Sequence, residues 1–450
     1  MKTGFARICI TPALGCELAG YYERRVAKGV LDDLYVTAVA FDDGAKRCII
    51  IGVDTCHLSV EFCDEARRLA SKKTGADFES IMINCSHTHT GPMVADDVER
   101  GMRADREYEK NLIISIAECA ERAILDLKES KLYSANGRAE NISFVRRYRM
   151  KGGNVQTNPG VDNENVDYPL GKANDELKLL RCVRESGGDV YIVNFGTHAD
   201  TVGGEYISGD WPNFTRDTVE GGIPNAKCLF ITGAQGDVNH INPNPTESDR
   251  IGLEYDTFDG VPRGYEHSKH MGRVVGGEVL KIAGKALPVD SSTLSYGMME
   301  IEIPSNKDNS RYDEAKVILD NHLSGRDDLI PFEKMELTTV VAEARRIVKL
   351  KNGPDSFKFT LSAIKVGGVV FASTPGELFT EIGLRIQENS PFENTFICCL
   401  TNGGQTYFPT SRAYDEGGYE ARSSQLKKGG DEIIVDGMNR LFEMLKLQKN

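Results

Sequence analysis

Several apolar, β-branched runs of strand length end abruptly in loops rich in Gly, Asn, His, Asp or Thr. Continuous apolar runs without polar alternation are typical of strands that are covered on both faces. Helical patterns lie between these runs, at residues 60–73 and 109–127. The pattern therefore predicts an α/β fold with mixed β-sheets flanked by helices, and functional residues are expected at the C-terminal ends of the strands. The clearest runs, with the loops that follow them, are residues 47–57, 80–92, 190–200, 227–240, 367–377 and 395–407.

A more charged segment of strand-helix-strand character occupies residues 295–365. No Pro/Gly/Ser linker separates it from the rest, and the chain has no internal repeat or low-complexity tract. We therefore expect residues 1–450 to form a single catalytic domain, with an inserted subdomain at about residues 295–365.

The net charge of −13 argues against a nucleic-acid-binding protein, because such proteins neutralise phosphates with an excess of Lys and Arg. The first residues, MKTGFARICITP, lack the apolar core of a signal peptide, and no apolar run approaches the roughly 18 residues of a spanning helix. These features predict a cytoplasmic protein that acts on a small molecule without stable membrane association; they do not specify an oligomeric state. The eleven cysteines are odd in number and form no CxxC pair, which indicates reduced core residues.

The strongest local motif is SHTHTGP, in which His87 and His89 follow an apolar strand with a spacing of two. Alternation along a strand would place both imidazoles on one face. Such a pair suits one metal ligand beside an acid/base group or a second ligand. A pair of surface histidines with satisfied hydrogen bonds is the alternative.

Three further strand ends carry groups of the same kind. His198, in NFGTHAD, repeats the layout of the first motif, and strand ends of an open α/β sheet converge on one crevice. Glu377 follows an apolar run and opens a helical pattern, where a helix-capping carboxylate is equally expected. Tyr407 and Tyr419 follow glycine turns, in loops where tyrosines most often pack with an exposed hydroxyl. Taken together, the motifs favour a metal site.

Two other segments near these motifs have more than one interpretation. The Gly-rich loop at residues 233–240 lacks the GxxxxGK[ST] phosphate pattern, but it suits a loop that holds an electrophile near a metal, with Gln235 and Asp237 among its polar groups. Trp211, in SGDWP, is the only tryptophan and suits either a substrate wall or a packed corner.

In family order, these motifs resemble the catalytic domain of the neutral/alkaline ceramidases, zinc amidases that release fatty acid from N-acyl sphingosine. The resemblance covers nearly the whole chain, from ITP and GYYERR through SHTHTGP, NFGTHAD, SGDWP and GAQGDVNH to PGELFTEIG and TNGGQTY. It implies that the Zn²⁺ ligands are His87, His198, Glu377 and Tyr407, and that His89 lies beside the metal. It also implies that Tyr419 lies near the reacting centre and that one of Arg146 and Arg147 faces the substrate head group.

The chain departs from the ceramidase pattern in two respects. The segment TGAQGDVNH has no serine where ceramidases have a serine-containing segment by the metal. The chain also stops soon after the last motif, so we expect no C-terminal immunoglobulin-like domain. The resemblance therefore transfers the chemistry more directly than the substrate.

The sequence predicts a zinc-dependent hydrolase that cuts an amide bond with a metal-activated water and acts on a small, soluble compound. One alternative is a metal- or ligand-binding protein that has lost turnover. Another is an ester or phosphoester hydrolase, because a fold does not fix its reaction.

Overall fold

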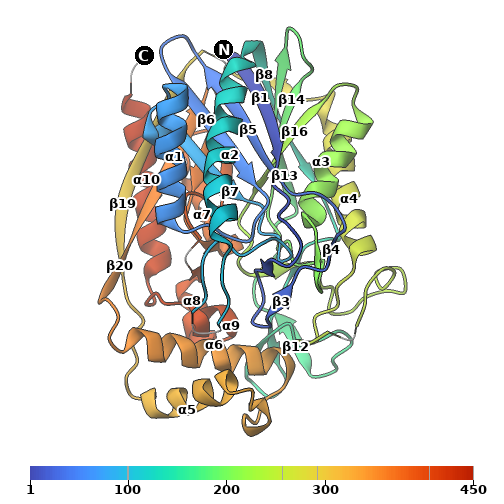
Figure 1. The fold of residues 1–450 in the computed structure, drawn as a ribbon, viewed down its shortest axis with the longest axis vertical. Coiled ribbons are helices and arrows are strands. Elements are labelled where there is room, and N and C mark those ends of the chain that lie inside the picture. The colour runs from blue at the N-terminus through green and yellow to red at the C-terminus, as the bar shows by residue number, and fades with distance from the viewer. Residues whose placement is uncertain (99–100, 256, 291, 405, 449–450) are drawn as a thin grey trace.

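The structure is a computed structural model that describes residues 1–98, 101–255, 257–290, 292–404 and 406–448. One mixed sheet forms its centre (Figure 1). The edge strand β16 contacts β5, β6 and β7 near the opposite edge, so this sheet curls back on itself. Its order is β16 (Lys227–Thr232), β14 (Val190–Phe195), β13 (Glu176–Arg184), β8 (Lys128–Arg138), β1 (Lys2–Cys9), β5 (Tyr35–Asp42), β6 (Arg47–Val53) and β7 (Ile81–Cys85), and β18 (Leu287–Pro288) pairs with β8.

A second sheet packs against the first and shares a core with it. Its order is β19 (Leu294–Pro304), β20 (Ser356–Val366), β21 (Val369–Ser373) and β23 (Asn394–Cys398). Fully buried side chains from both sheets meet between them, including Phe41, Ile192, Leu229, Phe371 and Phe396. The continuous apolar runs of the sequence are explained because the strands that they form are buried on both faces; these strands are β6, β7, β14, β16, β21 and β23.

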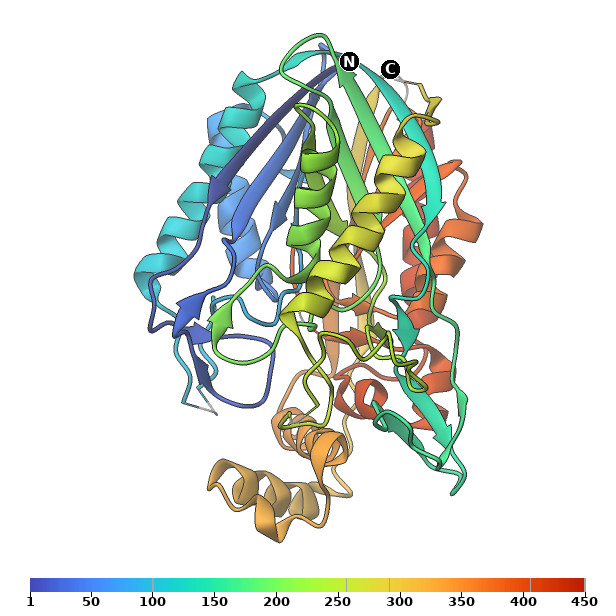
Figure 2. The same ribbon diagram turned by 90° about the vertical axis from the view of Figure 1, so that its right-hand side faces the viewer.

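Helices cover the outer faces in pairs. Helices α1 (Val60–Thr74) and α2 (Arg106–Leu125) pack on β1, β5 and β7 (Figure 1). Helices α3 (Asp210–Gly222) and α4 (Tyr265–Ala283) lie side by side over β8, β13 and β16 (Figure 2). Helices α7 (Thr380–Asn389) and α10 (Gly430–Leu447) cover the second sheet. The predicted α/β class with mixed sheets flanked by helices is confirmed.

Three parallel strand pairs, each joined through a helix, bring the candidate loops together. The units are β6–α1–β7, β14–α3–β16 and β21–α7–β23. Their C-terminal ends are tied by Asn84, whose side chain accepts a hydrogen bond from Thr232 N–H and donates one to the Cys399 carbonyl. The loops that follow β7, β16 and β23 therefore begin at one place.

A helical pair projects from the second sheet. Helices α5 (Tyr312–Leu323) and α6 (Lys334–Leu350) connect β19 to β20 and lie at the end of the molecule away from both termini (Figure 1). Helix α6 packs on the short helix α9 (Tyr419–Ser423), which follows α8 (Ser411–Glu416). The two strands at the ends of residues 295–365 belong to the second sheet, and a division of the chain into domains stays a prediction.

Smaller ladders complete the fold. They are β2 (Glu17–Leu18) with β3 (Arg25–Val26), β4 (Gly29–Val30) with β15 (Tyr206–Ile207), β9 (Phe144–Val145) with β17 (Val238–Asn239), β10 (Arg147–Met150) with β11 (Val155–Thr157) and β12 (Val166–Pro169), and β22 (Glu377–Leu378) with β24 (Tyr407–Phe408).

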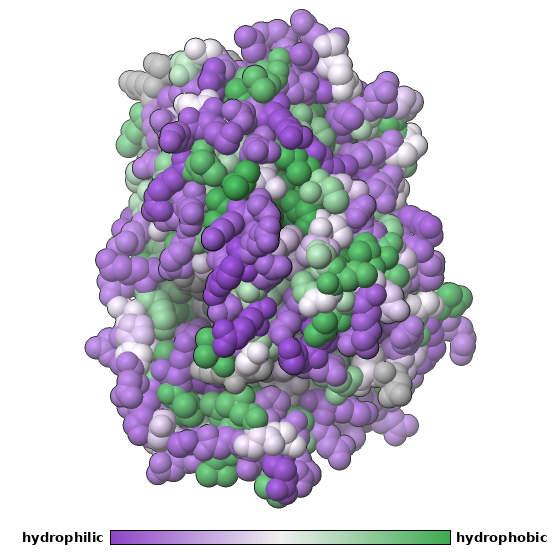
Figure 3. Space-filling model, viewed as in Figure 1, coloured by the Kyte–Doolittle hydropathy of each residue, from purple (hydrophilic) through white to green (hydrophobic). Residues whose placement is uncertain are grey.

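The eleven cysteines are free thiols, and nine of them are buried, as the sequence indicated. The face in Figure 3 is mostly hydrophilic, with separate hydrophobic patches. Among the described helices, none is both long and apolar enough to cross a membrane.

Candidate metal centre

Four loops bring the predicted ligands to the C-terminal ends of the parallel strands. His87 follows β7 and His198 follows β14, while Glu377 and Tyr407 come after β21 and β23. Glu377 and Tyr407 face each other as register partners of the parallel ladder β22–β24. The residues proposed from four separate motifs are thus neighbours in space.

Two imidazoles and one carboxylate form the centre of this group. Glu377 Oε2 lies 3.0 Å from His198 Nε2 and 3.4 Å from His87 Nε2. Ligand atoms bound to Zn²⁺ at about 2.1 Å in a tetrahedron are separated by about 3.4 Å. All three residues offer ligand atoms within 4.8 Å of one another. The spacing is therefore that of atoms sharing one metal ion.

Backbone carbonyls fix the orientation of both imidazoles. His87 Nδ1 donates a hydrogen bond to the Cys56 carbonyl at 2.8 Å, and His198 Nδ1 donates one to the Gln235 carbonyl at 2.8 Å. In a neutral imidazole, a protonated Nδ1 leaves the lone pair on Nε2, the atom that faces Glu377 in both residues. The tautomers are those required of metal ligands.

The protonation states of two of these groups also suit a metal. Burial alone would raise the pKa of Glu377, but His87 and His198 lower it well below its usual value. Burial, followed by the nearby Arg146 guanidinium, lowers the pKa of His198. Burial opposes protonation of His87, yet Cys56 and Glu377 raise its pKa well above the usual value. An ionised Glu377 and a neutral His198 are the forms that bind metal ions.

Arg146 links Tyr407 to the two-histidine group. Its Nη2 donates to the Tyr407 hydroxyl at 3.1 Å, and its Nη1 lies 3.3 Å from His198 Nε2. Glu420, which is fully buried, accepts a bond from Arg146 Nε at 2.7 Å. Burial and then Glu377 raise the pKa of the Tyr407 phenol well above its usual value, whereas Arg146 acts in the opposite direction. Arg146 is thus the cation beside the candidate phenolate.

The two histidines of SHTHTGP do not lie on a strand, so the expectation from strand alternation is wrong. Strand β7 ends at Cys85, and His87 has a left-handed backbone with φ of 68°. This turn, rather than the pleat of a strand, brings His89 Nε2 to 3.2 Å from His87 Nε2. The backbone turn at His87, which the motif does not predict, brings the two imidazoles close together.

His89 differs from His87 in its surroundings. Its Nδ1 is buried and has no hydrogen-bond partner among the described residues. Burial and then His87 lower its pKa well below the usual value, so the ring is neutral. In the part of the chain that the structure describes, His89 shares a potential metal-binding group only with Cys56 and His87. It lies beside the His87–His198–Glu377 group and keeps one ring nitrogen unused.

Tyr419 and Arg147 have different positions relative to this centre. The Tyr419 ring stands 5.6 Å from the Tyr407 ring, centroid to centroid, at the start of α9. Arg147 points away: its Nη2 donates to the Gly417 carbonyl and to Glu416. Of the two adjacent arginines, the structure therefore brings Arg146 to the centre and leaves Arg147 outside it.

Glu377 does not open a helix, so its interpretation as a helix-capping carboxylate is wrong. It lies in β22, and α7 begins at Thr380. The carboxylate that caps α7 belongs to Asp237, whose Oδ1 accepts bonds from Thr380 N–H and Thr380 Oγ1, both at 2.8 Å. Glu377 is therefore free for the metal-binding group.

Trp211 forms a packed corner: it is fully buried, and its Nε1 donates to the His198 carbonyl.

Sequence reasoning missed two residues of this region. Cys56 is the last residue but one of the segment at residues 47–57, and its Sγ lies 3.8 Å from His87 Nδ1. Glu420, which anchors Arg146, directly follows the predicted Tyr419. The signal for Cys56 was present, because it stands at the end of a parallel strand like the other candidates. No sequence signal distinguished Glu420 from a surface acid.

No sequence model of a known protein family matches this chain, and no curated protein matches it in sequence. Solved structures match its fold. The crystal structure of neutral ceramidase from Pseudomonas aeruginosa has a TM-score of 0.72 and 16% identity, over 99% of this chain and 75% of that one. A ceramidase complexed with C2 has a TM-score of 0.71 and 15% identity, over 100% of this chain and 76% of that one. The chain thus has the fold of neutral ceramidases, which the motifs implied.

Proposed function

We propose that the protein is a zinc-dependent hydrolase that cleaves the amide bond of an N-acyl compound. The observation that carries this proposal is the position of Glu377 Oε2, at 3.0 Å from His198 Nε2 and 3.4 Å from His87 Nε2. The likeness of the fold to that of ceramidases supports an amide as the bond that is cut.

In this proposal, His87, His198, Glu377 and Tyr407 hold the metal. Two imidazole nitrogens, a carboxylate and a phenol are donors of the kind that Zn²⁺ accepts. Bound zinc supplies a Lewis acid and lowers the pKa of water to about 7. Arg146 fits the same set, because a cation that donates to the Tyr407 hydroxyl favours its phenolate form.

The residues beside the metal have separate tasks. His89, neutral and with an unused Nδ1, accepts a proton from the attacking water and then passes it to the leaving amine. Tyr419 stands next to Tyr407 and donates to the substrate oxygen as negative charge develops there. Gln235 Nε2 lies 3.4 Å from Glu377 Oε2 and helps to hold that carboxylate in place.

We further propose a small, water-soluble substrate and a cytoplasmic location. The net charge of −13 supports the water-soluble substrate, since an acidic protein is repelled by anionic lipid surfaces. Turnover of a short-chain N-acyl amide is expected to exceed that of long-chain ceramide in phosphatidylserine-containing vesicles. Vesicle co-sedimentation combined with robust hydrolysis of vesicle ceramide would refute this substrate class and leave the zinc chemistry untouched.

A substrate panel with and without a chelator tests the function. Acyl amides, acyl esters and phosphoesters are assayed with the wild type, with His87→Ala and with His322→Ala, a matched control on the distant helix α5. We expect amide hydrolysis that the chelator abolishes, that zinc restores, that His87→Ala lacks and that His322→Ala keeps. Zinc binding without turnover of any compound would indicate a binding protein, and turnover of esters or phosphoesters alone would indicate the other hydrolase chemistry.

A further inference from the structure

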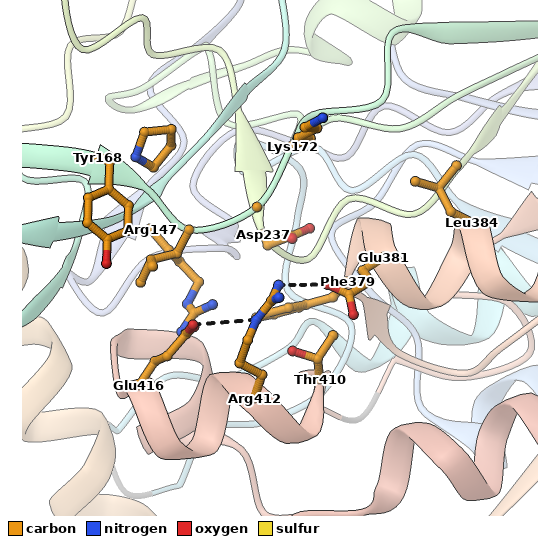
Figure 4. A pocket seen from close by; sticks show the side chains of 13 residues that line it. Arg147, Tyr168, Lys172, Asp237, Phe379, Glu381, Leu384, Thr410, Arg412 and Glu416 are labelled. Atoms are coloured by element: carbon orange, nitrogen blue, oxygen red, sulfur yellow. Dashed lines mark hydrogen bonds and ion pairs between the residues drawn. The ribbon is translucent and has the colours of Figure 1, made fainter.

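A cavity of about 500 Å³ is lined by Arg147, Asp237 and Phe379, among other residues (Figure 4). Its volume falls within the range of about 300–1,000 Å³ typical of small-molecule sites. Its lining includes neither Arg146 nor any of the four candidate metal ligands, although Arg147 directly follows Arg146 in the chain. Arg146 reaches the metal centre and Arg147 lines this rear pocket, since adjacent side chains of an extended segment point to opposite faces.

Two buried side chains of opposite charge line the rear pocket without pairing with each other. Arg147 is 2% exposed and Asp237 is 5% exposed. Within the described residues, the ion pairs of Arg147 go to Glu416, at 3.3 Å, and Glu420, at 3.8 Å, and none joins it to Asp237. A buried cation and a buried anion that face one cavity are suited to binding a ligand of both charges.

Both groups have unused hydrogen-bonding capacity. Asp237 Oδ1 accepts both hydrogen bonds from Thr380, and Asp237 Oδ2 has no partner in the described part of the chain. All side-chain hydrogen bonds that Arg147 makes to described residues use Nη2, and its buried Nε faces Glu420 Oε2 at 3.8 Å, so Nη1 is the nitrogen without a partner among the described residues. One carboxylate oxygen and part of one guanidinium therefore remain for a ligand.

The rest of the lining contains apolar side chains at two sides and several charged ones between them. Tyr168 and Leu384 lie at opposite sides of the pocket, and Phe379 lies between them (Figure 4). Arg412 is engaged with Glu381, at 2.8 Å, and with Glu416, at 3.4 Å, so it adds no free charge. Lys172 also lines the pocket, and its ammonium group pairs with none of the described residues. The pocket thus combines one free acceptor, on Asp237, with the Lys172 ammonium, the partly free Arg147 guanidinium and several apolar side chains.

We propose that the rear pocket binds an aliphatic α-amino acid, whose ammonium group faces Asp237 Oδ2, whose carboxylate faces the Arg147 guanidinium and whose side chain packs between Tyr168 and Leu384. This site is separate from the proposed hydrolase centre and does not depend on its activity.

Calorimetric titration of the full-length protein tests the proposal with three probes of similar shape. They are L-leucine, 4-methylpentanoate, which lacks the amine, and 3-methylbutylamine, which lacks the carboxylate. We expect L-leucine to bind, and each analogue to bind about tenfold or more weakly, because each loses a hydrogen-bonded charge pair. No heat of binding for L-leucine at millimolar concentration, or equal binding of all three probes, would overturn the proposal.

Two variants localise the binding. Asp237→Asn keeps the acceptor for Thr380 and should weaken L-leucine by about tenfold, with little change for 4-methylpentanoate. Leu384→Trp fills the cavity from α7 and should abolish binding of every probe, whereas Leu125→Trp, at the exposed end of α2, should leave it unchanged. Undiminished binding of L-leucine to Leu384→Trp would place the ligand elsewhere and refute the site.

Discussion

Glu377 and Tyr407 stand opposite each other in a two-residue parallel ladder, at the ends of loops that follow different strands of the second sheet. This pairing sets a carboxylate and a phenol beside the imidazoles of His87 and His198, which come from the first sheet. The candidate metal centre is therefore assembled at the junction of the two sheets. Its integrity depends on the register of this ladder as well as on the four side chains.

The charge of Glu377 should be essential for zinc binding. Glu377→Gln keeps the size of the side chain but removes the anion that lies between two imidazoles. We expect the zinc affinity to fall by more than about a hundredfold, because losing a direct ligand costs more than losing a residue that orients one. Competition with a chromophoric chelator measures this, with Glu388→Gln, exposed on α7, as the control. Unchanged affinity would exclude Glu377 as a ligand.

The two histidines of SHTHTGP should separate metal binding from catalysis. His89→Ala is expected to keep about one zinc per chain and to lower kcat by about a hundredfold or more, because His89 supplies a proton and not a ligand. His87→Ala, like His198→Ala, is expected to lose the metal. Metal analysis and steady-state kinetics on the same preparations give both values. Equal loss of zinc in His89→Ala and His87→Ala would show that the roles are assigned wrongly.

Arg146 should act through Tyr407. Arg146→Lys keeps the charge beside Glu420 but loses the planar fork that reaches both Glu420 and the Tyr407 hydroxyl. We expect zinc affinity to fall by about tenfold to a hundredfold, the usual effect of losing a residue that orients a ligand. Arg149→Lys, whose side chain bonds only to the nearby Gly153 carbonyl among the described residues, should have no effect. A folded Arg146→Lys variant with wild-type zinc affinity would contradict this role.

The fold could be predicted largely from the sequence, because its strands are apolar on both faces and its parallel pairs are separated by amphipathic helices. The runs that end before Asp54, Ser86 and Gly196 are strands β6, β7 and β14. The sequence does not predict the curl of the long sheet or the packing of that sheet on the second sheet. These depend on contacts between strands that are distant in sequence, such as those that Asn84 makes.

The sequence named candidate residues for the site but not their geometry. The motifs identified His87, His198, Glu377 and Tyr407, which the fold brings together. They could not show that His87 adopts a left-handed turn, because backbone conformation is not readable from residue type there. Nor could the motifs show which of Arg146 and Arg147 points to the centre. The packing of an extended segment against the rest of the fold decides on which face each side chain lies.

The hydrogen bonds of Asn84 should stabilise the place where the C-terminal ends of β7, β16 and β23 meet. Asn84→Ala leaves the Thr232 N–H buried without its acceptor, takes one of two donors from the Cys399 carbonyl and removes the donor to the Thr401 hydroxyl. Each lost partner costs about 1–3 kcal/mol, so we expect the free energy of unfolding to fall by about 3 kcal/mol. Urea unfolding of the metal-free protein measures it, against Asn136→Ala at an exposed position of β8. A loss no greater than that of the control would show that the junction is held by other contacts.

Anomalous scattering at the zinc edge, from crystals grown with zinc, tests whether the four residues bind the metal. We expect a single strong peak within about 2.0–2.2 Å of His87 Nε2, His198 Nε2, a Glu377 carboxylate oxygen and the Tyr407 hydroxyl. We also expect His89 to stay off the metal. No peak at this position in zinc-saturated crystals, or a peak held instead by Cys56, His87 and His89, would show that the proposed zinc site is wrong.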